Sequence, residues 1–452
     1  MNRILSIAAV TLRSAIRSRI VVFMMLLLVF ILVGIPPAIR GDGTLTGYVQ
    51  VLLSYTLGFA GIILSIVAVW TGCTAVSAEI KTHQLDMVVT KPVPAIQIWL
   101  GKWLGILVLS FVLLLFTFGS AYGGLRWAMT RRAADQKDLQ KLREQVLVAR
   151  EQIPPREEGL AEQADNLLAV RQAEGGIPEG LTAAAARRVI EDNLRLQANS
   201  VPGGYSRQWI FDIGVLPANR PLFLRYTFSA PRDDIEGMWL AGARENRDQA
   251  VRRVTETPGG FYTWRIPPAA VNRDGTLPVE YGNINSEPVT VIFPPEKPPM
   301  LLFYHDSFEM NFLRVFLVVL VRIAMLSAIG LTAGTLFSQP VALFFSAWIV
   351  LLLNVGRYIQ SMAATQTFFQ VHDGPVRVPG LLDKLLHLFF AALDRMLHPL
   401  QSPDVLGALA AGEWVSWATV AVEAAVKILI FSGLLALLSA FVLNRREVGL
   451  PS

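Results

Sequence analysis

Few residues of this sequence are spaced for catalysis or for metal binding. None of the histidines forms the short ligand spacing of a zinc site with the single cysteine or with another histidine: His83, His305, His372, His387, His398 and Cys73. The pair His372-Asp373 comes nearest to a site, and its setting is typical of a surface loop. We therefore expect no bound metal and no catalytic residues in this chain.

The sequence also lacks the motifs of nucleotide binding and of hydrolase catalysis. Gly101-Lys102 lacks both the preceding glycine and the following hydroxyl residue of a phosphate-binding loop. The Gly-x-Ser-x-Gly turn of a hydrolase nucleophile is absent as well. We expect the chain to hold no cofactor of its own and not to be an enzyme.

Four ionisable residues inside long apolar runs are the sharper signal. Arg314 and Arg322 lie in one run, and Glu423 and Lys427 lie one helical turn apart in the last run. Charges at bilayer depth cost several kcal/mol and usually face protein or water as pairs. We predict that Glu423 pairs with Lys427 or with one of the arginines. The pair would either lock two spans together or line a substrate path.

The elements that carry these residues are predicted from hydropathy. The chain has 452 residues, of which only 17% are charged, whereas soluble proteins carry about a quarter. Apolar runs near the membrane-spanning length of roughly 20 residues cover 20–39, 49–77, 99–121, 311–337, 341–357 and 415–443. The fold class expected is an α-helical polytopic membrane protein with six transmembrane helices and an inserted extracytoplasmic α+β domain.

Charged flanks predict the orientation of the spans. Residues 1–19 form an arginine-rich amphipathic pattern that is typical of an interfacial helix. Lysine and arginine also cluster after the second span and at Arg445-Arg446, which places these loops and both termini in the cytoplasm. The first apolar run has no signal-peptide cleavage site. We expect a multi-pass protein of the membrane.

The segment 78–100 connects the second and third spans and is itself amphipathic. It begins near Glu79 and turns at Lys91-Pro92-Val93-Pro94 before the apolar run resumes. Such a segment is poorly suited to a pore and well suited to lying on the membrane surface against a soluble partner.

The same residues resemble a family. Permease subunits of ABC-2 type ABC transporters carry Glu, then Leu, then Lys-Pro-Val, then Gly-Lys at the next span. The matching positions here are Glu79, Leu85, Lys91-Pro92-Val93 and Gly101-Lys102. The chain is similar to the branch labelled multi-copper-enzyme-maturation permeases, with His83-Gln84 where many members have Gly-Thr. The motif covers spans one to three, the topology fits spans four to six, and the insert lies outside the resemblance.

The resemblance implies a coupling helix in 78–100 that docks on a separate ATPase subunit. The residues implied in the contact are Glu79, Lys81, Leu85, Met87, Val88, Lys91 and Pro92. The apolar members would supply contact area and the charged members would steer the encounter. The resemblance also implies two ATPase copies that bind ATP and Mg, a second permease subunit that is identical or different, and a bacterial inner membrane.

The insert between spans three and four is expected outside the membrane in two parts. Leu139, Leu142, Val146 and Ala149 form a narrow apolar seam, which predicts a helical hairpin or coiled coil within 128–206. Short alternating runs within 207–306 predict a β-sandwich with strands at 208–213, 222–229, 237–241, 261–266, 277–281 and 289–293. This domain would contact a periplasmic partner, a substrate or the second permease.

A second external element follows the fifth span. Residues 381–397 are strongly amphipathic and too charged to span, so we expect them on the outer membrane surface or between spans. The predicted organisation is an interfacial helix over 1–19, spans one to three over 20–127, the insert over 128–206 and 207–306, spans four and five over 307–357, a loop over 358–414, and span six with the tail over 415–452.

The function expected is that of an ATP-driven permease subunit, and two alternatives stay open. A membrane-anchored scaffold or assembly factor would act through the external domain. An ion-coupled secondary transporter would use Arg322, Glu423 and Lys427, and inverted repeats, which are not evident, would favour it. The expected partners are lipid and protein, and nucleic acid is not among them.

Overall fold

A computed structural model describes residues 2–38, 44–81, 93–132, 136–156, 159–173, 183–214, 221–242, 250–295, 297–364 and 380–445. The chain divides into two compact units. The helical unit comprises Met1–Ala149, Asp306–Ala363 and Phe390–Ser452, and the inserted unit comprises Arg150–His305 and Ala364–Phe389. The chain is therefore a helical protein with a second domain inserted into its sequence.

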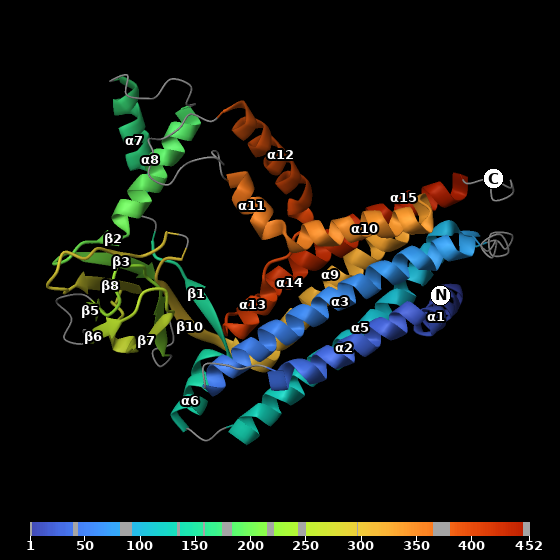
Figure 1. Cartoon of the computed structure of the whole chain (residues 1–452), viewed down its shortest axis with the longest axis horizontal. Coiled ribbons are helices and arrows are strands. Elements are labelled where there is room, and N and C mark those ends of the chain that lie inside the picture. Colours follow the sequence, from blue (N-terminus) through green and yellow to red (C-terminus); the bar gives the residue numbers. More distant parts are fainter. Residues whose placement is uncertain are drawn as a thin grey trace. The chain divides into compact units, whose positions relative to one another are not determined.

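The helical unit contains several long apolar helices and shorter ones between them (Figure 1). Its helices are α1 (Asn2–Arg17), α2 (Arg19–Ala38), α3 (Leu45–Lys81), α5 (Ala95–Arg132), α6 (Gln136–Gln145), α9 (Phe308–Leu336), α10 (Gln339–Asn354), α11 (Gly356–Ala364), α13 (Val405–Ala410), α14 (Trp417–Ala424) and α15 (Gly433–Arg445). The 3-10 turn η2 (His398–Leu400) precedes α13, and the π-helical segment η3 (Ala425–Ser432) joins α14 to α15. The boundary between the two units falls within α12 (Leu381–Leu397).

Four of these helices are long and apolar enough to cross a membrane. They cover Leu45–Ser77, Ala95–Thr130, Phe308–Leu336 and Trp417–Arg445, which confirms four of the predicted runs as long apolar helices. α1 and α2 form a fifth candidate, bent by 69° at Ser18. α10 is apolar but shorter, with 16 residues. The described residues therefore give four to five crossings by length and composition.

Small residues allow the helices to approach closely. α1 packs on α5, and a Cβ atom on Gly101 would lie only 2.8 Å from the Ile7 side chain. The neighbouring Lys102 is buried and donates to the carbonyl oxygen of Ala75 in α3 at 2.8 Å. The Gly-Lys pair thus ties together α1, α3 and the first turns of α5.

The helical hairpin or coiled coil predicted from the seam at 139–149 is wrong for these residues. α6 ends at Gln145, and strand β1 begins at Val148. Leu142 and Val146 are buried in the same core as residues of α3. Asp138 of α6 also accepts hydrogen bonds from the Leu45 amide and the Thr46 hydroxyl, so it caps α3. The apolar seam therefore packs against α3 in the helical unit. The spacing of its residues predicts a packed face but not the element that covers it.

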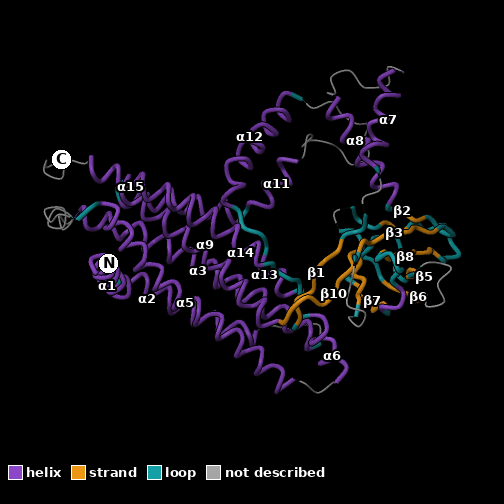
Figure 2. Tube along the Cα trace, turned by 180° about the vertical axis from the view of Figure 1, so that it is seen from behind, coloured by secondary structure: helices purple, strands orange, loops and turns teal. Residues whose placement is uncertain are grey.

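Among the described residues of 148–307, the chain forms ten strands and two α-helices. The strands are β1 (Val148–Ile153), β2 (Ser200–Val201), β3 (Ser206–Asp212), β4 (Leu222–Tyr226), β5 (Ile235–Ala241), β6 (Ala250–Glu256), β7 (Tyr262–Ile266), β8 (Thr276–Asn283), β9 (Val291–Ile292) and β10 (Met300–Ser307), with a 3-10 turn, η1, at Pro268–Ala270. They form sheets in the orders β1-β10-β4-β7 and β3-β8-β5-β6, plus the pair β2-β9. Figure 2 draws the strands in orange. α7 (Leu160–Ala173) and α8 (Ala183–Ala198) pack on each other.

Aromatic side chains fill the space between the two four-stranded sheets. Trp239 of β5 contacts Tyr226 of β4 with ring centroids 4.4 Å apart, so the sheets meet face to face. Trp209 and Phe293 pack on the same core. Strands β3, β4, β5, β7, β8 and β9 overlap the predicted ones, whereas β1, β2, β6 and β10 were missed. β6 (AVRRVTE) was missed because charged residues interrupt its alternation.

Candidate functional site

The implied ATPase-contact residues fall at the edge of the described chain. Glu79 and Lys81 lie in the last turn of α3, where only the backbone is described. Leu85, Met87, Val88, Lys91 and Pro92 lie outside the described residues. Their role in docking therefore stays a prediction.

The predicted pairing of Glu423 is present. Lys427 forms an ion pair with Glu423 one turn earlier in the same helix, and only 1% of the Lys427 side chain is exposed. The lysine ammonium also donates to the Ser402 hydroxyl and, at 2.9 Å, to the carbonyl oxygen of Gln401. An ammonium has three N–H donors. Each of the three donors has an acceptor in the protein, so the buried ammonium leaves no N–H group without a hydrogen bond.

The acceptors for Lys427 come from an irregular stretch of chain. Residues 401–404 connect η2 to α13 and expose backbone carbonyls rather than a helical ladder. Ser402 completes a triangle because its hydroxyl donates to Glu423 Oε2 at 3.2 Å. Non-helical backbone at membrane depth is tolerated where it is buried in protein or lines a cavity. The Glu423–Lys427 pair anchors this stretch to the last long helix.

The last long helix departs from α-helical geometry where it carries Lys427. Residues Ala425–Ser432 form the π-helical segment η3, and the Ser432 hydroxyl donates to the Lys427 carbonyl oxygen at 2.7 Å. π-Helical turns mark functional sites often, because the inserted residue re-aims its neighbours. Sequence reasoning missed this feature, since apolar runs carry no signal for it.

Arg322 does not pair with a carboxylate through a hydrogen bond in the described chain. Its Nη2 donates to Asn354 Oδ1 of α10 at 3.1 Å. Arg322 and Asn354 line a cavity of about 130 Å³ together with Gly58, Gly61 and Ser402. Ser402, which contacts both Glu423 and Lys427, lines the same cavity as Arg322. The structure therefore places three of the four predicted intramembrane charges in one neighbourhood.

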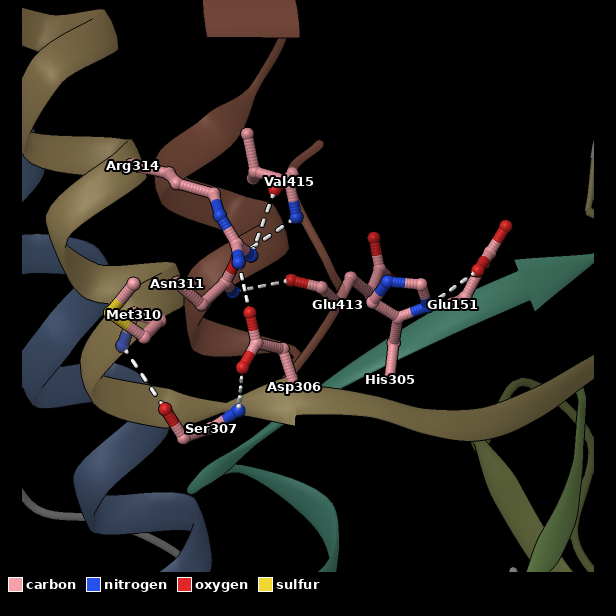
Figure 3. Close-up of polar contacts among 9 residues, drawn as sticks. All are labelled: Glu151, His305, Asp306, Ser307, Met310, Asn311, Arg314, Glu413 and Val415. Carbon is pink, nitrogen blue, oxygen red and sulfur yellow. Dashed lines mark hydrogen bonds and ion pairs between the residues drawn. The ribbon is translucent and has the colours of Figure 1, made fainter. Parts of the chain in front are cut away.

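The fourth charge, Arg314, belongs to a separate cluster at the start of α9 (Figure 3). It forms an ion pair with Asp306 and donates from Nη1 to the carbonyl oxygen of Val415 at 3.2 Å. The Trp417 ring lies 5.2 Å from its guanidinium carbon. Within the described residues its Nε finds no hydrogen-bond partner. Arg314 thus joins α9 to the entry of α14.

Asn311 reinforces the same junction. Its side-chain amide donates to the Glu413 carbonyl oxygen at 2.7 Å and accepts from the Val415 amide at 2.8 Å (Figure 3). Ser307 caps α9 by accepting from the Met310 amide at 3.3 Å. The sequence prediction considered only charged residues in the apolar runs, so it missed Asn311. The signal that could have found it is an asparagine in an apolar run three residues before Arg314.

In the inserted unit, His305 and Glu151 form a pair of their own. His305 Nδ1 lies 2.9 Å from Glu151 Oε2, and both side chains are more than a third exposed (Figure 3). The two residues stand on the neighbouring strands β10 and β1. No group of three or more His, Cys, Asp or Glu in the described ranges could hold a metal ion.

These observations define an integral membrane protein with a β-sheet domain inserted between its long apolar helices. No protein-family model, no curated protein and no solved structure matches the chain.

Proposed function

We propose that the chain is the membrane-spanning permease subunit of an ABC-2-like transporter, driven by a separate ATPase subunit. Counting α2 and α10 as crossings adds two spans to the four long helices and gives the six spans of this class. Both termini and the segment 78–100 then face the cytoplasm. The permease would work as a dimer with two ATPase copies, in a bacterial inner membrane.

The observation that carries the proposal is the way α3 and α5 meet beside the motif. α3 is apolar over Leu45–Ser77, 33 residues, or about 50 Å at 1.5 Å per residue. This exceeds the roughly 30 Å of hydrocarbon, and the proposal places the excess at the C-terminal end of α3, beside the motif. At that end Lys102 of α5 binds the Ala75 carbonyl of α3. A force on the segment between these helices would reach both of them directly.

An ion-coupled transporter is the second candidate, and one observation favours it. The buried Glu423–Lys427 pair lies near Arg322 and its cavity. Coupling ions are often moved by such groups in transporters. Uptake or efflux that follows a proton gradient, with no ATPase present, would favour this candidate over the ATP-driven one.

The test of the proposal is co-purification with a candidate ATPase in detergent. The variant combines Glu79→Arg with Leu85→Asp, and the matched control combines Glu162→Arg with Val170→Asp, a carboxylate and an apolar side chain exposed on α7. We expect the wild type and the control to retain the ATPase and the variant to lose it while staying folded. Equal retention by the variant, or no ATPase on the wild type, would refute the proposal.

A further inference from the structure

The cavity beside Arg322 is reached from the middle of the long apolar helix α9. α9 contains as many residues before Arg322 (308–321) as after it (323–336). The cavity of about 130 Å³ has walls from Gly58 and Gly61 of α3, Asn354 of α10, and Gln401 and Ser402. A Cβ atom on either glycine would meet nothing within 4 Å. The two glycines therefore leave open space at the wall that α3 contributes to the cavity.

Donors gather at this cavity. A guanidinium has five N–H groups, and among the described residues only Asn354 accepts from Arg322. The Gln401 amide nitrogen is buried and has no described partner. Glu423 is held by Lys427 and Ser402, and the exposed Asp404 at the cavity rim accepts from the Gly407 amide of α13. The nearest carboxylates are thus engaged, while the donors have capacity for an anion.

An apolar groove of about 460 Å³ adjoins this cavity. It runs between α3 and α10 and is lined by Ile66, Trp70, Leu343, Ala347 and Leu351. The groove and the cavity share Ile62 and Asn354 in their walls. One ligand can therefore touch both, with an apolar part in the groove and a charged part at Arg322.

We propose that the groove and the cavity form one binding site for an amphiphile, an acyl chain that carries an anionic carboxylate or phosphate head. The acyl chain lies in the groove, and the head takes the free donors of Arg322 and the Gln401 amide. Ordinary lipid headgroups stay at the membrane surface, about 15 Å from the bilayer centre. A head at Arg322 is therefore selected by the protein, because the charge of a half-buried arginine in a membrane-spanning helix is costly without an anion and a guanidinium pairs well with carboxylate or phosphate oxygens.

That the amphiphile is the transported substrate rests on the proposed transport function. That it binds at this site does not depend on that function. The binding test uses the full chain in detergent without ATPase or nucleotide. A failed ATPase co-purification would leave the binding result intact, and a failed binding result would leave ATPase docking intact. The two proposals can therefore fail separately.

The probe is a palmitic acid analogue with a photoreactive diazirine in its chain and a terminal alkyne, compared with its neutral methyl ester. We expect the acid to label peptides of α3 and α10 around the groove about tenfold more than the ester, the usual scale for losing a hydrogen bond to a charged group. Arg322→Gln should reduce acid labelling to the ester level, and Arg322→Lys should restore part of it.

Filling variants check the position of the ligand without removing a charge. Gly61→Leu fills the cavity and Ala347→Trp fills the groove, and both should reduce acid labelling. Gly119→Leu is the matched control, because Gly119 of α5 also has open space and lines neither wall. Equal labelling by acid and ester, or full labelling of Arg322→Gln or Ala347→Trp, would overturn the proposal.

Competition distinguishes the sources of the head. Displacement of the probe by unlabelled palmitic acid alone identifies a carboxylate, and displacement by phosphatidic acid identifies a lipid phosphate; either supports the site. If inorganic phosphate displaces the probe as well as phosphatidic acid does, the acyl chain contributes nothing and the amphiphile proposal is refuted.

Discussion

Gly330 of α9 lies so close to Val69 of α3 that a methyl group on Gly330 would come within 2.6 Å of the Val69 carbonyl oxygen. One turn later Gly334 meets the Cys73 carbonyl, and Gly72 of α3 faces Ser327 in return. The two helices pack backbone to backbone along this line. Gly330 and Gly334 form the small-xxx-small spacing that supports close helix packing in membranes.

Gly330→Ala should therefore destabilise the helical unit, although alanine favours helix. The added methyl group meets backbone atoms, which cannot rotate away, so the helices must separate. Overpacking of this kind costs about 1–3 kcal/mol. Thermal unfolding in detergent should show a lower transition temperature. Gly119→Ala, which adds a methyl group in open space, should leave the transition unchanged or raise it, and equal effects of the two would contradict the argument.

The fate of Lys427 tests whether its ion pair is a structural lock. Lys427→Met leaves the largely buried Glu423 carboxylate beside Ser402 without its cation, and breaking buried pairs costs about 3–5 kcal/mol. Replacing both partners, with Glu423→Gln and Lys427→Met, should recover most of that loss because no bare charge remains. Denaturant unfolding of the two variants would measure the difference.

A different pattern would identify a role beyond structure. If the double variant is as stable as the wild type and has lost activity, the pair also serves transport. If Lys427→Met alone is as stable as the wild type, the lock does not exist, and the contacts of Lys427 with Ser402 and Gln401 contribute nothing to stability.

The junction between α9 and α14 supports a third prediction. Asn311→Asp keeps the acceptor for the Val415 amide and replaces the donor to the Glu413 carbonyl by an oxygen. Leaving buried polar groups unpaired costs about 1–3 kcal/mol each. We expect Asn311→Asp to lower the unfolding temperature and Glu309→Gln, on the exposed side of the same turn, to leave it unchanged. Increased protease cleavage at 411–416 would locate the damage, and its absence would argue against the junction.

The sequence was sufficient for features that depend on composition and period. Four apolar runs became long helices, and six of the alternating segments overlap strands, because both patterns report which face is buried. The sequence was insufficient to predict how α6 packs, because its apolar seam is compatible both with a coiled coil and with packing on α3. The sequence predicted a partner for Glu423 among Lys427 and the arginines, and the structure shows that the partner is Lys427. Ser402, Gln401 and Asn354 could not be found, since only the tertiary fold brings these polar residues to the apolar helices.

The buried carboxyl of Glu256 makes the inserted unit sensitive to pH. Burial raises the pKa of Glu256 above its ordinary value of 4.5, although the Tyr226 hydroxyl donates to both of its oxygens at 2.9 Å and Arg252 lies 3.5 Å away. The folded state then binds a proton that the unfolded state has released. The stabilising contribution is complete below pH 4.5 and is lost as the pH rises through the folded-state pKa.

We therefore expect Glu256→Gln to remove a stability slope of at most about 1.4 kcal/mol per pH unit above pH 4.5. The neutral amide keeps a hydrogen bond to Tyr226 and carries no charge to desolvate. Near-ultraviolet circular dichroism should follow unfolding, because Tyr226 and Trp239 are in ring contact.

Asp274→Asn provides a control of opposite sign. Hydrogen bonds from Thr276 hold the pKa of Asp274 below its usual 3.8, so its contribution is present above pH 3.8 and lost as the pH falls through the folded-state pKa. Unfolding of this variant should differ from the wild type in the acid range only. The free energy of unfolding of Glu256→Gln could instead change with pH above 4.5 as steeply as that of the wild type. In that case Glu256 is ionised in the folded protein, and its charge is balanced by Arg252.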